Sequence, residues 1–359
     1  MKTKSFLLFS TSVFATSIFL ILFHSQQPQS IQNIVTQTHQ HIKDFKVSRN
    51  FENLRDVEER HLVEEERYLS SVGLGSQPVE LWHNTSVPAL VTYARGDGHA
   101  QAIGFLRAVT ARLTHTVLLY NVGLAPHSLA IVSNYCNSSK CAIIEFDLSE
   151  FPSHVSDESI SAFRPLIIQH ALSRVGGVIF CEPWQRWAGS SDSLKAAWGA
   201  ITDTGVSAIP RRAAVTSLTH PRMFKYFRAT IDDFLFVQML DVSRLMVAKK
   251  LPVQQLMKTW IQCALTLDCI MPIGAQSGGC KFDKKPQYRY SGCHEQDASA
   301  LSIILGLQFG FDESRYTQGS AAAALWGKRS EPEAKADYLA LRRNATDQLL
   351  HNTASHLLH

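Results

Sequence analysis

From about residue 79 onward, the chain alternates between short apolar runs and longer amphipathic segments. Apolar runs of strand length occur at residues 89–94, 116–120, 141–146 and 178–180. Apolar residues at helical spacing separate these runs over residues 99–112, 126–134 and 165–175. Pro165 stands at a helix start, where its missing N–H is harmless, and Gly176 and Gly177 end that helix. The pattern predicts βαβ units and an α/β fold: a doubly wound, mixed but mostly parallel sheet flanked by helices.

The second half of this region is predicted to be mainly helical. We expect a short strand at residues 206–209 and helices at residues 190–200, 234–250, 252–267 and 298–309. From Ser330 the chain becomes charged and rich in alanine, which predicts a peripheral helix and a frayed tail. The histidines of that tail, His351, His356 and His359, are spaced too loosely to indicate a metal site.

A long apolar run near the N-terminus follows two basic residues. Lys2 and Lys4 precede residues 6–23, a run interrupted only by Ser, Thr and Ala. Its length is close to the ~17–25 residues that cross a bilayer, and it ends without the small-x-small site of a cleaved signal peptide. A cleaved signal peptide is the alternative interpretation. Because no Lys or Arg follows the run until Lys43, the positive-inside rule predicts a type II membrane protein.

The segment after the apolar run is polar and rich in charge, which predicts a helical stem. Its heptads are irregular, so a solvated spacer is the alternative to a weak coiled coil that would form a homodimer. The predicted organisation has five parts. They are a cytoplasmic tail at residues 1–5, a transmembrane signal-anchor at 6–23, a stem at 24–78, a lumenal domain at 79–329 and a peripheral C-terminal tail at 330–359.

Glycosylation sequons and charge are consistent with a lumenal domain. N-x-Ser/Thr sequons, which are modified only on lumenal surface loops, occur at Asn84, Asn137 and Asn344. The formal net charge is +4, and no dense basic patch is interleaved with aromatic residues. A nucleic acid is therefore not an expected partner.

Seven cysteines indicate disulfides in an oxidising compartment. Four of them lie in one compact stretch, and we expect them to form two bridges: Cys263, Cys269, Cys280 and Cys293. Cys136 and Cys141 can close a small local loop, which leaves Cys181 as the odd thiol on a buried strand end. A structural zinc site is the alternative, although the spacing of the four is not C-x-x-C.

Ligands of open α/β sheets bind at the carboxyl ends of the strands. The first strand is followed by residues 95–99 (RGDGH), whose glycines would allow a nucleotide to approach closely. The pattern is neither G-x-G-x-x-G nor a P-loop, so a generic tight turn is the alternative.

Two acidic segments are candidates for a metal site. The fourth strand ends just before Glu182, and a second cluster at residues 292–297 (GCHEQD) contains His294, Glu295 and Asp297. Carboxylates with an imidazole can hold Mn²⁺ or Mg²⁺, the ions that bind a diphosphate. The alternatives are that Glu182 pairs with Arg186, that Glu295 is solvated, and that Asp297 caps the following helix.

Several ordered motifs stand out along the chain. They are Tyr120–Leu124 (YNVGL), Phe151–Val155 (FPSHV), Arg164–Gln169 (RPLIIQ), Trp260–Leu265 (WIQCAL) and Asp268–Ile270 (DCI). This series resembles an animal family of uncharacterised nucleotide-diphospho-sugar transferase-like proteins. The resemblance covers about residues 79–311. It implies a glycosyltransferase of the GT-A fold that is distantly similar to glycosyltransferase family 8.

The resemblance assigns expected roles to individual residues. Glu182 falls where the family has an aspartate in a Trp-x-Asp-Ser stretch, the place of a DXD metal motif, although this chain has no strict DXD. His294 and Asp297 match a His-Arg-Tyr-Asp-Gln-Ser-Ala segment in which Glu295, Gln296 and Ala298 differ. The implied ligands of a Mn²⁺ or Mg²⁺ cofactor are Glu182, His294 and Asp297. Asp297 is also the expected catalytic residue. The expected donor-binding residues are Thr92, Tyr93 and Arg164.

The leading hypothesis is a Golgi-type glycosyltransferase of the secretory pathway. It would move a sugar from a nucleotide-diphospho-sugar, such as a UDP-sugar, to a glycan or protein acceptor, with metal and Arg164 neutralising the departing diphosphate. The second hypothesis is a catalytically degenerate lumenal module of the same fold that binds a glycan or a partner. A serine hydrolase is disfavoured because the sequence has no G-x-S-x-G elbow.

Overall fold

The computed structural model describes residues 64–75, 79–82, 87–136, 140–283, 286–317 and 324–327. No helix within these ranges is long and apolar enough to cross a bilayer. The predicted cytoplasmic tail, the anchor at 6–23, most of the stem, the C-terminal tail from residue 330 and the sequon asparagines lie outside the described residues.

Six strands form one mixed sheet in the order β3-β2-β1-β4-β7-β6. Their bounds are Ala89–Gly96 (β1), Val117–Leu124 (β2), Cys141–Glu145 (β3), Gly177–Cys181 (β4), Val206–Ala214 (β6) and Gln238–Ala248 (β7). β1 pairs in parallel with β2 and β4, and β2 pairs in parallel with β3. β7 runs antiparallel to both β4 and β6. The predicted mixed, mostly parallel sheet is confirmed.

Helices lie along the chain between and after the strands. Their bounds are His99–Thr110 (α3), Pro126–Tyr135 (α4), Phe163–Val175 (α5), Ser191–Gly199 (α6), Pro221–Tyr226 (α7), Leu251–Leu265 (α8), Leu267–Ile270 (α9) and Gln296–Gln308 (α10). Short 3-10 turns occur at Leu148–Glu150 (η1), Ser153–Ser156 (η2), Val215–Ser217 (η3), Ile231–Phe234 (η4) and Glu313–Arg315 (η5). A two-stranded sheet pairs Arg186–Trp187 (β5) with Trp326–Gly327 (β8).

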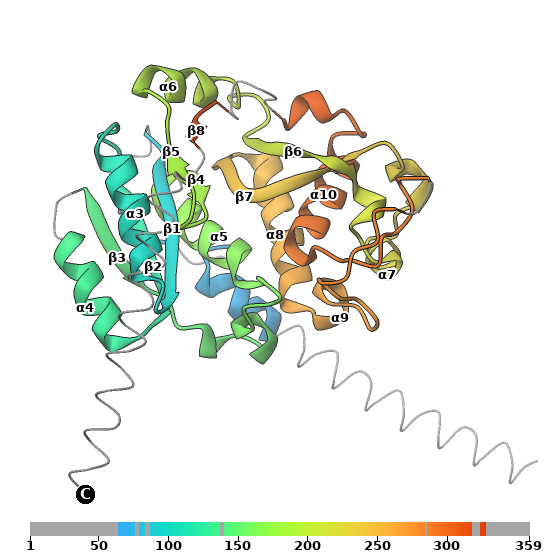
Figure 1. Cartoon of the computed structure of the whole chain (residues 1–359), viewed down its shortest axis with the longest axis horizontal. Helices are drawn as coiled ribbons and strands as arrows, with labels where there is room; N and C mark the ends of the chain where they lie inside the picture. The colour runs from blue at the N-terminus through green and yellow to red at the C-terminus, as the bar shows by residue number, and fades with distance from the viewer. Residues whose placement is uncertain are drawn as a thin grey trace, which may run out of the picture. The chain divides into compact units, whose positions relative to one another are not determined.

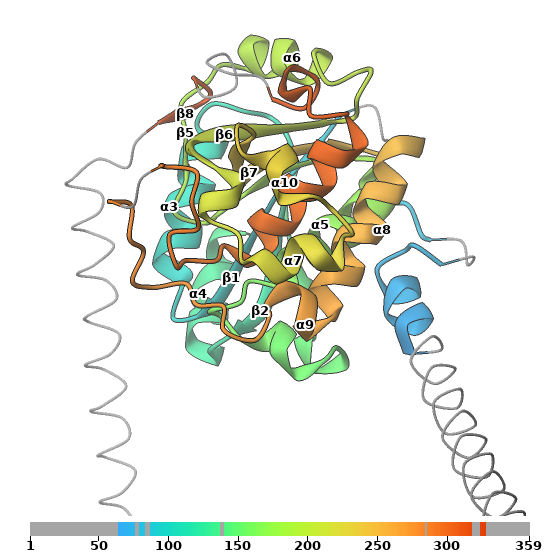
Figure 2. The ribbon, with the colours of Figure 1, turned by 90° about the vertical axis from the view of Figure 1, so that its right-hand side faces the viewer.

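The sheet is buried on both faces, as successive residues of its central strands show. Val178 and Phe180 of β4 belong to a core cluster with α5, α8 and α10, which lie beside one another in Figure 2. Ile179 and Cys181 belong to a second cluster, which contains residues of α3 and α6. Because side chains alternate along a strand, the two clusters pack against opposite faces of the sheet, and continuous apolar runs are the expected sequence of such strands.

One predicted element is wrong: residues 234–250 do not form a helix. Their main part is β7, an antiparallel strand between β4 and β6 that carries the sheet from its parallel half to its antiparallel edge (Figure 1). Buried residues of β7 point to both faces, for example Leu245 toward the first cluster and Met246 toward the second. A strand that is buried on both faces has no period of two, so its apolar pattern cannot be told from that of a buried helix.

Three disulfides confirm that Cys136 and Cys141 form a local bridge and that the four later cysteines form two bridges, whose partners the sequence left open. They are Cys136–Cys141, Cys263–Cys269 and Cys280–Cys293. Cys181 is the free cysteine and is fully buried at the end of β4. The four cysteines that could have held zinc are therefore consumed in disulfides.

Candidate functional site

The sheet changes direction at β1. The chain moves outward from β1 to β2 and β3 and then returns to place β4 on the other side of β1. At such a switch point the connections leave in opposite directions, and a crevice opens at the carboxyl ends of the two strands. A cavity of about 380 Å³ lies there. Its lining residues are Tyr93, Ala94, Arg95, Gly98, Gln101, Glu158, Ser161, Phe163, Arg164, Glu182, Pro183 and Trp184.

The turn after β1 brings a helix N-terminus to this cavity. Gly96 has a φ of +52°, a conformation that glycine adopts without strain, and Gly98 is the N-cap of α3. No side chain caps α3, and both Gly98 and Gln101 line the cavity. Asp97 instead faces His127 of α4, with Oδ1 3.3 Å from Nε2. The predicted turn is therefore part of the cavity wall, through its glycine and its arginine.

Arg95 is fixed at the edge of the cavity. Its Nε lies 3.0 Å from the Glu158 carboxylate, and its Nη2 donates to the Ser156 carbonyl. Its Nη1 is buried without a hydrogen-bond partner. Buried donors are nearly always satisfied in proteins, so this guanidinium nitrogen has a donor position open to an acceptor from water or from a ligand in the cavity.

Four side chains from distant segments form a buried network beside the cavity. The Tyr93 hydroxyl donates to Glu182 Oε2 at 2.6 Å. The other carboxylate oxygen, Oε1, is 2.6 Å from Arg164 Nε, and this contact is an ion pair without hydrogen-bond geometry. Arg164 Nη1 donates to Asp297 Oδ1 and Oδ2 at 3.1 and 3.0 Å. The Arg164 guanidinium thus pairs with the carboxylates of both Glu182 and Asp297.

Backbone contacts hold the two carboxylates in place. Glu182 follows the last residue of β4, and its N–H donates to the Ser243 carbonyl of β7 at 2.9 Å. Asp297 lies in the first turn of α10, where its Oδ1 accepts from the Ala298 N–H at 3.0 Å. The indole N–H of Trp260, a fully buried residue of α8, donates to the Asp297 carbonyl at 2.9 Å. The alternative that Asp297 caps this helix is wrong, because Glu295 is the N-cap and Asp297 is the second residue of α10.

The charges of this network perturb one another. Burial raises the pKa of Asp297 to about 6, the charge of Glu182 adds to the rise, and Arg164 opposes it. Burial disfavours the charged form of Arg164, but the carboxylates of Asp297 and Glu182 raise its pKa above the ordinary value. Burial and the Glu182 charge also raise the pKa of Tyr93, so its hydroxyl keeps the proton that it donates.

His294 does not join the predicted set. Its side chain is fully buried, its Nδ1 accepts from the His220 N–H at 3.2 Å, and its Nε2 donates to the Ile270 carbonyl at 3.0 Å. Burial lowers the pKa of His294 to about 4, so the imidazole is neutral. Both ring nitrogens are engaged by backbone groups, which leaves neither as a metal ligand.

The predicted ligands do not fit a divalent cation. Glu182 and Asp297 converge as their metal role would require, but the Arg164 guanidinium lies between them and pairs with both. In the described part of the chain, no group of three or more His, Cys, Asp or Glu side chains could hold a metal ion. The position that Mn²⁺ or Mg²⁺ would take is filled by a cation of the chain itself.

The remaining predicted residues divide between cavity and core. Tyr93 and Arg164 line the cavity, whereas Thr92 is fully buried and does not. The structure pairs Glu295 with Arg211 of β6, and the Glu295 side chain remains 30% exposed. Arg186 donates to the Pro183 and Gln185 carbonyls, at 3.1 and 2.9 Å.

The lining residues without an assigned role include Arg95, Phe163 and Trp184. Arg95, which belongs to the predicted turn at residues 95–99, is the last residue but one of β1; Phe163 begins α5; and Trp184 follows β4, where its side chain is 45% exposed. The signal for Arg95 and Trp184 was their position at strand ends, which is where ligands of such sheets bind. Phe163 precedes a proline on a helix and had no comparable signal.

Comparison with known proteins gives only remote matches. No protein-family model matches the sequence, and no curated protein matches it. Among solved structures, apo mouse xyloside xylosyltransferase 1 is similar with a TM-score of 0.36 and 9% identity, over 65% of this chain and 84% of that chain. The galactosyltransferase LgtC in complex with donor and acceptor sugar analogues is similar with a TM-score of 0.33 and 11% identity, over 48% of this chain and 59% of that chain.

The apo form of the bifunctional glycosyltransferase WbbM gives a TM-score of 0.41 and 10% identity, over 68% of this chain and 40% of that chain. This chain thus matches less than two thirds of LgtC and of WbbM. At such identities and scores the likenesses carry no inference about activity. The functional interpretation rests on the cavity and the residues around it.

Proposed function

We propose that the domain binds a nucleoside-diphosphate sugar in the crevice between β1 and β4 and is a GT-A-like glycosyltransferase. The observation that carries the proposal is the combination of a cavity at the switch point of the sheet with the uncapped N-terminus of α3 and the unsatisfied Arg95 Nη1. A helix N-terminus and an arginine are the groups that bind phosphate oxygens. The volume of about 380 Å³ is within the ordinary range of ligand sites.

Each part of such a donor has a matching wall in the cavity. The diphosphate would lie against Gly98 and Arg95, and the base would stack on the exposed ring of Trp184. Arg164 would face the diphosphate from the Glu182 side. Asp297 is 2% exposed and does not line the cavity, so it would act as a positioning residue that fixes Arg164.

The proposed reaction is the transfer of a sugar to a glycan or protein acceptor. An acceptor hydroxyl oxygen bonds to the anomeric carbon, and the bond from that carbon to the diphosphate breaks. Its electron pair leaves with the nucleoside diphosphate, and the hydroxyl proton is lost to water. Arg95 and Arg164 would stabilise the charge that grows on the leaving group, a task that divalent metals perform in other enzymes.

We also propose that the protein is a type II membrane protein of the Golgi or another secretory-pathway membrane. The three disulfides support an oxidising compartment. The full-length protein should stay in the membrane pellet after alkaline carbonate washing and carry endoglycosidase-sensitive glycans. Recovery of a soluble secreted form that begins near Gln26 would show that residues 6–23 are a cleaved signal peptide instead.

The donor site is tested by calorimetry of full-length protein, in mild detergent, with UDP and UDP-sugars. We expect UDP to bind with and without Mn²⁺, and Arg95→Ala to weaken binding by about tenfold, because one charge-assisted contact is lost. Arg107→Ala is the matched control, since Arg107 lies on the outer part of α3 and contacts Tyr135. Absence of binding by any nucleotide would refute the proposal.

One observation favours the second candidate, a non-catalytic module of the same fold. The charge of Arg164 is already shared between two carboxylates, which reduces its attraction for a diphosphate. Hydrolysis or transfer from a bound UDP-sugar separates the two candidates: release of free sugar or a glycosylated product identifies an enzyme. Tight UDP binding without turnover identifies the module.

A further inference from the structure

A second and larger cavity lies on the antiparallel side of the sheet, outside the crevice described above. Its volume is about 690 Å³. Three segments form its walls: residues 211–218 from the end of β6 through η3, residues 235–238 before and at the start of β7, and the loop from Cys280 to Cys293. We call it the β6 pocket.

An irregularity in strand pairing creates this pocket. Pro210 of β6 pairs with Leu240 of β7, and the next pair is Ala214 with Gln238. Three residues of β6, at positions 211–213, therefore face the single Met239 of β7. Such bulges bend a strand and redirect its side chains, and they are common beside functional sites. Here the bulge turns two arginines to the mouth of the pocket.

The walls of the β6 pocket carry positive charge and no negative charge. Arg211 and Arg212 line it, and no Asp or Glu does. Arg211 is paired with Glu295, which is not a lining residue. No described residue forms an ion pair with Arg212, whose side chain is exposed. The Arg212 guanidinium could therefore bind two oxygens of an acidic group in the pocket.

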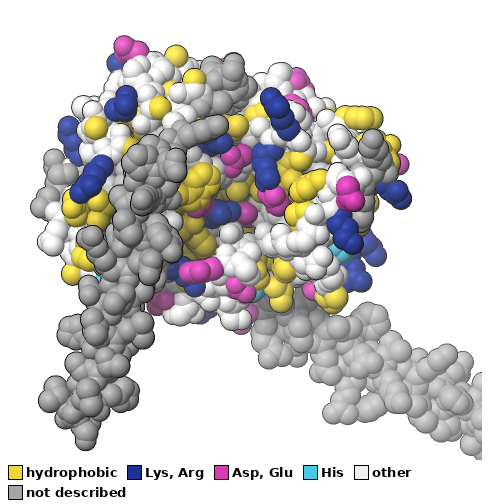
Figure 3. Space-filling model, in the orientation of Figure 1, with side chains coloured by type: hydrophobic (Ala, Val, Ile, Leu, Met, Phe, Trp, Pro, Cys, Tyr) yellow, Lys and Arg dark blue, Asp and Glu magenta, His cyan; other side chains and the backbone are white. Residues whose placement is uncertain are grey.

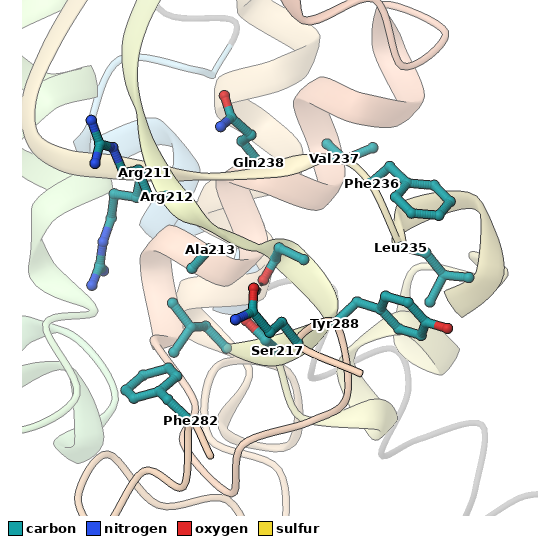
Figure 4. A pocket seen from close by; sticks show the side chains of 13 residues that line it. Arg211, Arg212, Ala213, Ser217, Leu235, Phe236, Val237, Gln238, Phe282 and Tyr288 are labelled. Carbon is teal, nitrogen blue, oxygen red and sulfur yellow. Dashed lines mark hydrogen bonds between the residues drawn. The ribbon is translucent and has the colours of Figure 1, made fainter. Parts of the chain in front are cut away.

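Three aromatic residues line the pocket: Phe236, Phe282 and Tyr288. Phe236 is 85% exposed and Phe282 is 59% exposed, although both are large apolar residues. The Phe236 and Tyr288 rings meet edge to face, with centroids 6.0 Å apart. Figure 4 shows the two arginines at one end and the Phe236 and Tyr288 rings at the other. A single exposed apolar residue is ordinary, but a group around one cavity indicates a ligand.

The described residues of the loop that lines the pocket, at 280–283 and 286–293, are tied to the rest of the domain. The Cys280–Cys293 disulfide joins its two ends. The N–H and the hydroxyl of Ser291 both donate to the Ser217 carbonyl, at 2.9 and 2.7 Å. The Thr216 hydroxyl donates to the Tyr288 carbonyl at 2.6 Å. A pocket whose walls are already fixed loses little conformational entropy when a ligand binds.

One short segment connects the β6 pocket to the crevice. Glu295 contacts Arg211 of the pocket, and Asp297, two residues later, contacts Arg164 of the crevice. The start of α10 thus contacts one lining residue of each cavity, although neither Glu295 nor Asp297 lines a cavity itself.

We infer that the β6 pocket binds an oligosaccharide that carries an acidic group, a carboxylate or a sulfate. The C–H faces of sugar rings pack on Phe236 and Tyr288, Gln238 and Gln287 meet the hydroxyls, and Arg212 binds the acidic group. The binding of this saccharide is independent of the proposed function. Its role as the acceptor of the transferred sugar rests on the proposed function. Charge complementarity distinguishes it from a neutral glycan.

The test uses full-length protein in mild detergent and a chondroitin sulfate tetrasaccharide, with its desulfated and carboxyl-reduced form as the neutral probe. We expect the acidic probe to bind and the neutral probe to bind at least tenfold more weakly. Arg212→Ala and Phe236→Ala should each weaken binding about tenfold, which is the loss of one charge-assisted or aromatic contact. Both residues are exposed, so neither change threatens folding.

Controls separate this inference from the donor site. Arg107→Ala should leave tetrasaccharide binding unchanged, and Arg212→Ala should leave UDP binding unchanged. Tetrasaccharide binding without UDP binding would support the β6 pocket and refute the donor proposal. Equal binding of the neutral probe, no effect of Arg212→Ala, or binding of an acidic peptide such as poly-glutamate in place of the tetrasaccharide would overturn the inference.

Discussion

Arg164 Nη1 lies 3.1 and 3.0 Å from the two carboxylate oxygens of Asp297, although the two residues are 133 positions apart in the chain. The same guanidinium meets Glu182, so the cluster has one positive and two negative groups when all are ionised. Its net charge reaches zero when one carboxylate is protonated. Burial raises the pKa of Asp297 to about 6, so this carboxylate takes up a proton in mildly acidic solution.

The first prediction concerns the pH dependence of stability. The pKa of Asp297 is about 6 in the folded protein, against an ordinary value of 3.8 for an aspartate, a difference of about 2 units. Because the folded pKa is raised, its contribution is fully present below pH 3.8 and is lost as the pH rises through about 6. At about 1.36 kcal/mol per unit, the loss is roughly 2–3 kcal/mol.

Urea unfolding at pH 4, 5, 6 and 7 measures this effect by comparison with Asp297→Asn, which cannot titrate. The free energy of unfolding of the parent relative to the variant should fall across this range. The control is Asp203→Asn, at an exposed position. Its free energy of unfolding should change with pH in the same way as that of the parent. A parent-to-Asp297→Asn difference that is constant with pH, or one that grows, would contradict the assignment.

The second prediction concerns the removal of Arg164. Arg164→Ala leaves the Glu182 and Asp297 carboxylates, 3% and 2% exposed, without their counter-ion. Breaking a buried ion pair from one side costs about 3–5 kcal/mol of unfolding free energy. Exposed Arg107→Ala should cost no more than about 0.5 kcal/mol.

A neutralised background tests the cause of that loss. Arg164→Ala should cost much less in a Glu182→Gln, Asp297→Asn protein, because no buried carboxylate then needs a counter-ion. Equal costs in both backgrounds would mean that lost packing, rather than charge, explains the first result.

The third prediction concerns metal ions. In the parent protein, Mn²⁺ should not raise the melting temperature through Glu182 and Asp297, because Arg164 already pairs with both. In Arg164→Ala the two carboxylates become available, and Mn²⁺ should restore part of the lost stability. Differential scanning fluorimetry with Mn²⁺ and with EDTA measures both. Stabilisation of the parent that disappears in Asp297→Asn would show that the ion displaces Arg164.

The fourth prediction concerns the thiol of Cys181. The side chain is fully buried, and burial raises the pKa of its thiol well above the ordinary value. A neutral, inaccessible thiol reacts slowly, so iodoacetamide should label none of the folded protein and one cysteine per chain after unfolding without reductant. Peptide mapping should place that label on Cys181. Labelling of any other cysteine would contradict the three disulfides.

The parallel half of the sheet was predictable because its elements are short and clearly bounded. The apolar strands β1 to β4 are separated by helices, and Gly176 ends α5 with a φ of +73° as expected. β7 was not predictable as a strand, because it is buried on both faces and its pattern resembles that of a helix. β6 was predicted too short, since its second part, from Pro210, carries arginines and a bulge instead of an apolar run.

The sequence predicted several residues of the candidate site, but it did not predict how these residues contact one another. Glu182 and Asp297 were selected because each adds a carboxylate at the end of a strand or before a buried helix, and the fold brings them together. Sequence could not show that Arg164 pairs with both, since a side-chain contact over 133 positions leaves no local pattern. Nor could it show that the nitrogens of His294 are engaged by backbone groups rather than by a ligand.

The three disulfides join cysteines only 5, 6 and 13 residues apart. Short loops close quickly and at a low entropic cost, so each pair can be oxidised as soon as a small part of the chain has emerged during synthesis. Along the chain, the pairs become complete in the order Cys136 with Cys141, next Cys263 with Cys269, and last Cys280 with Cys293. Once β4 is enclosed by its neighbours, Cys181 is removed from thiol exchange, and the finished protein has no reactive partner with which its disulfides could reshuffle.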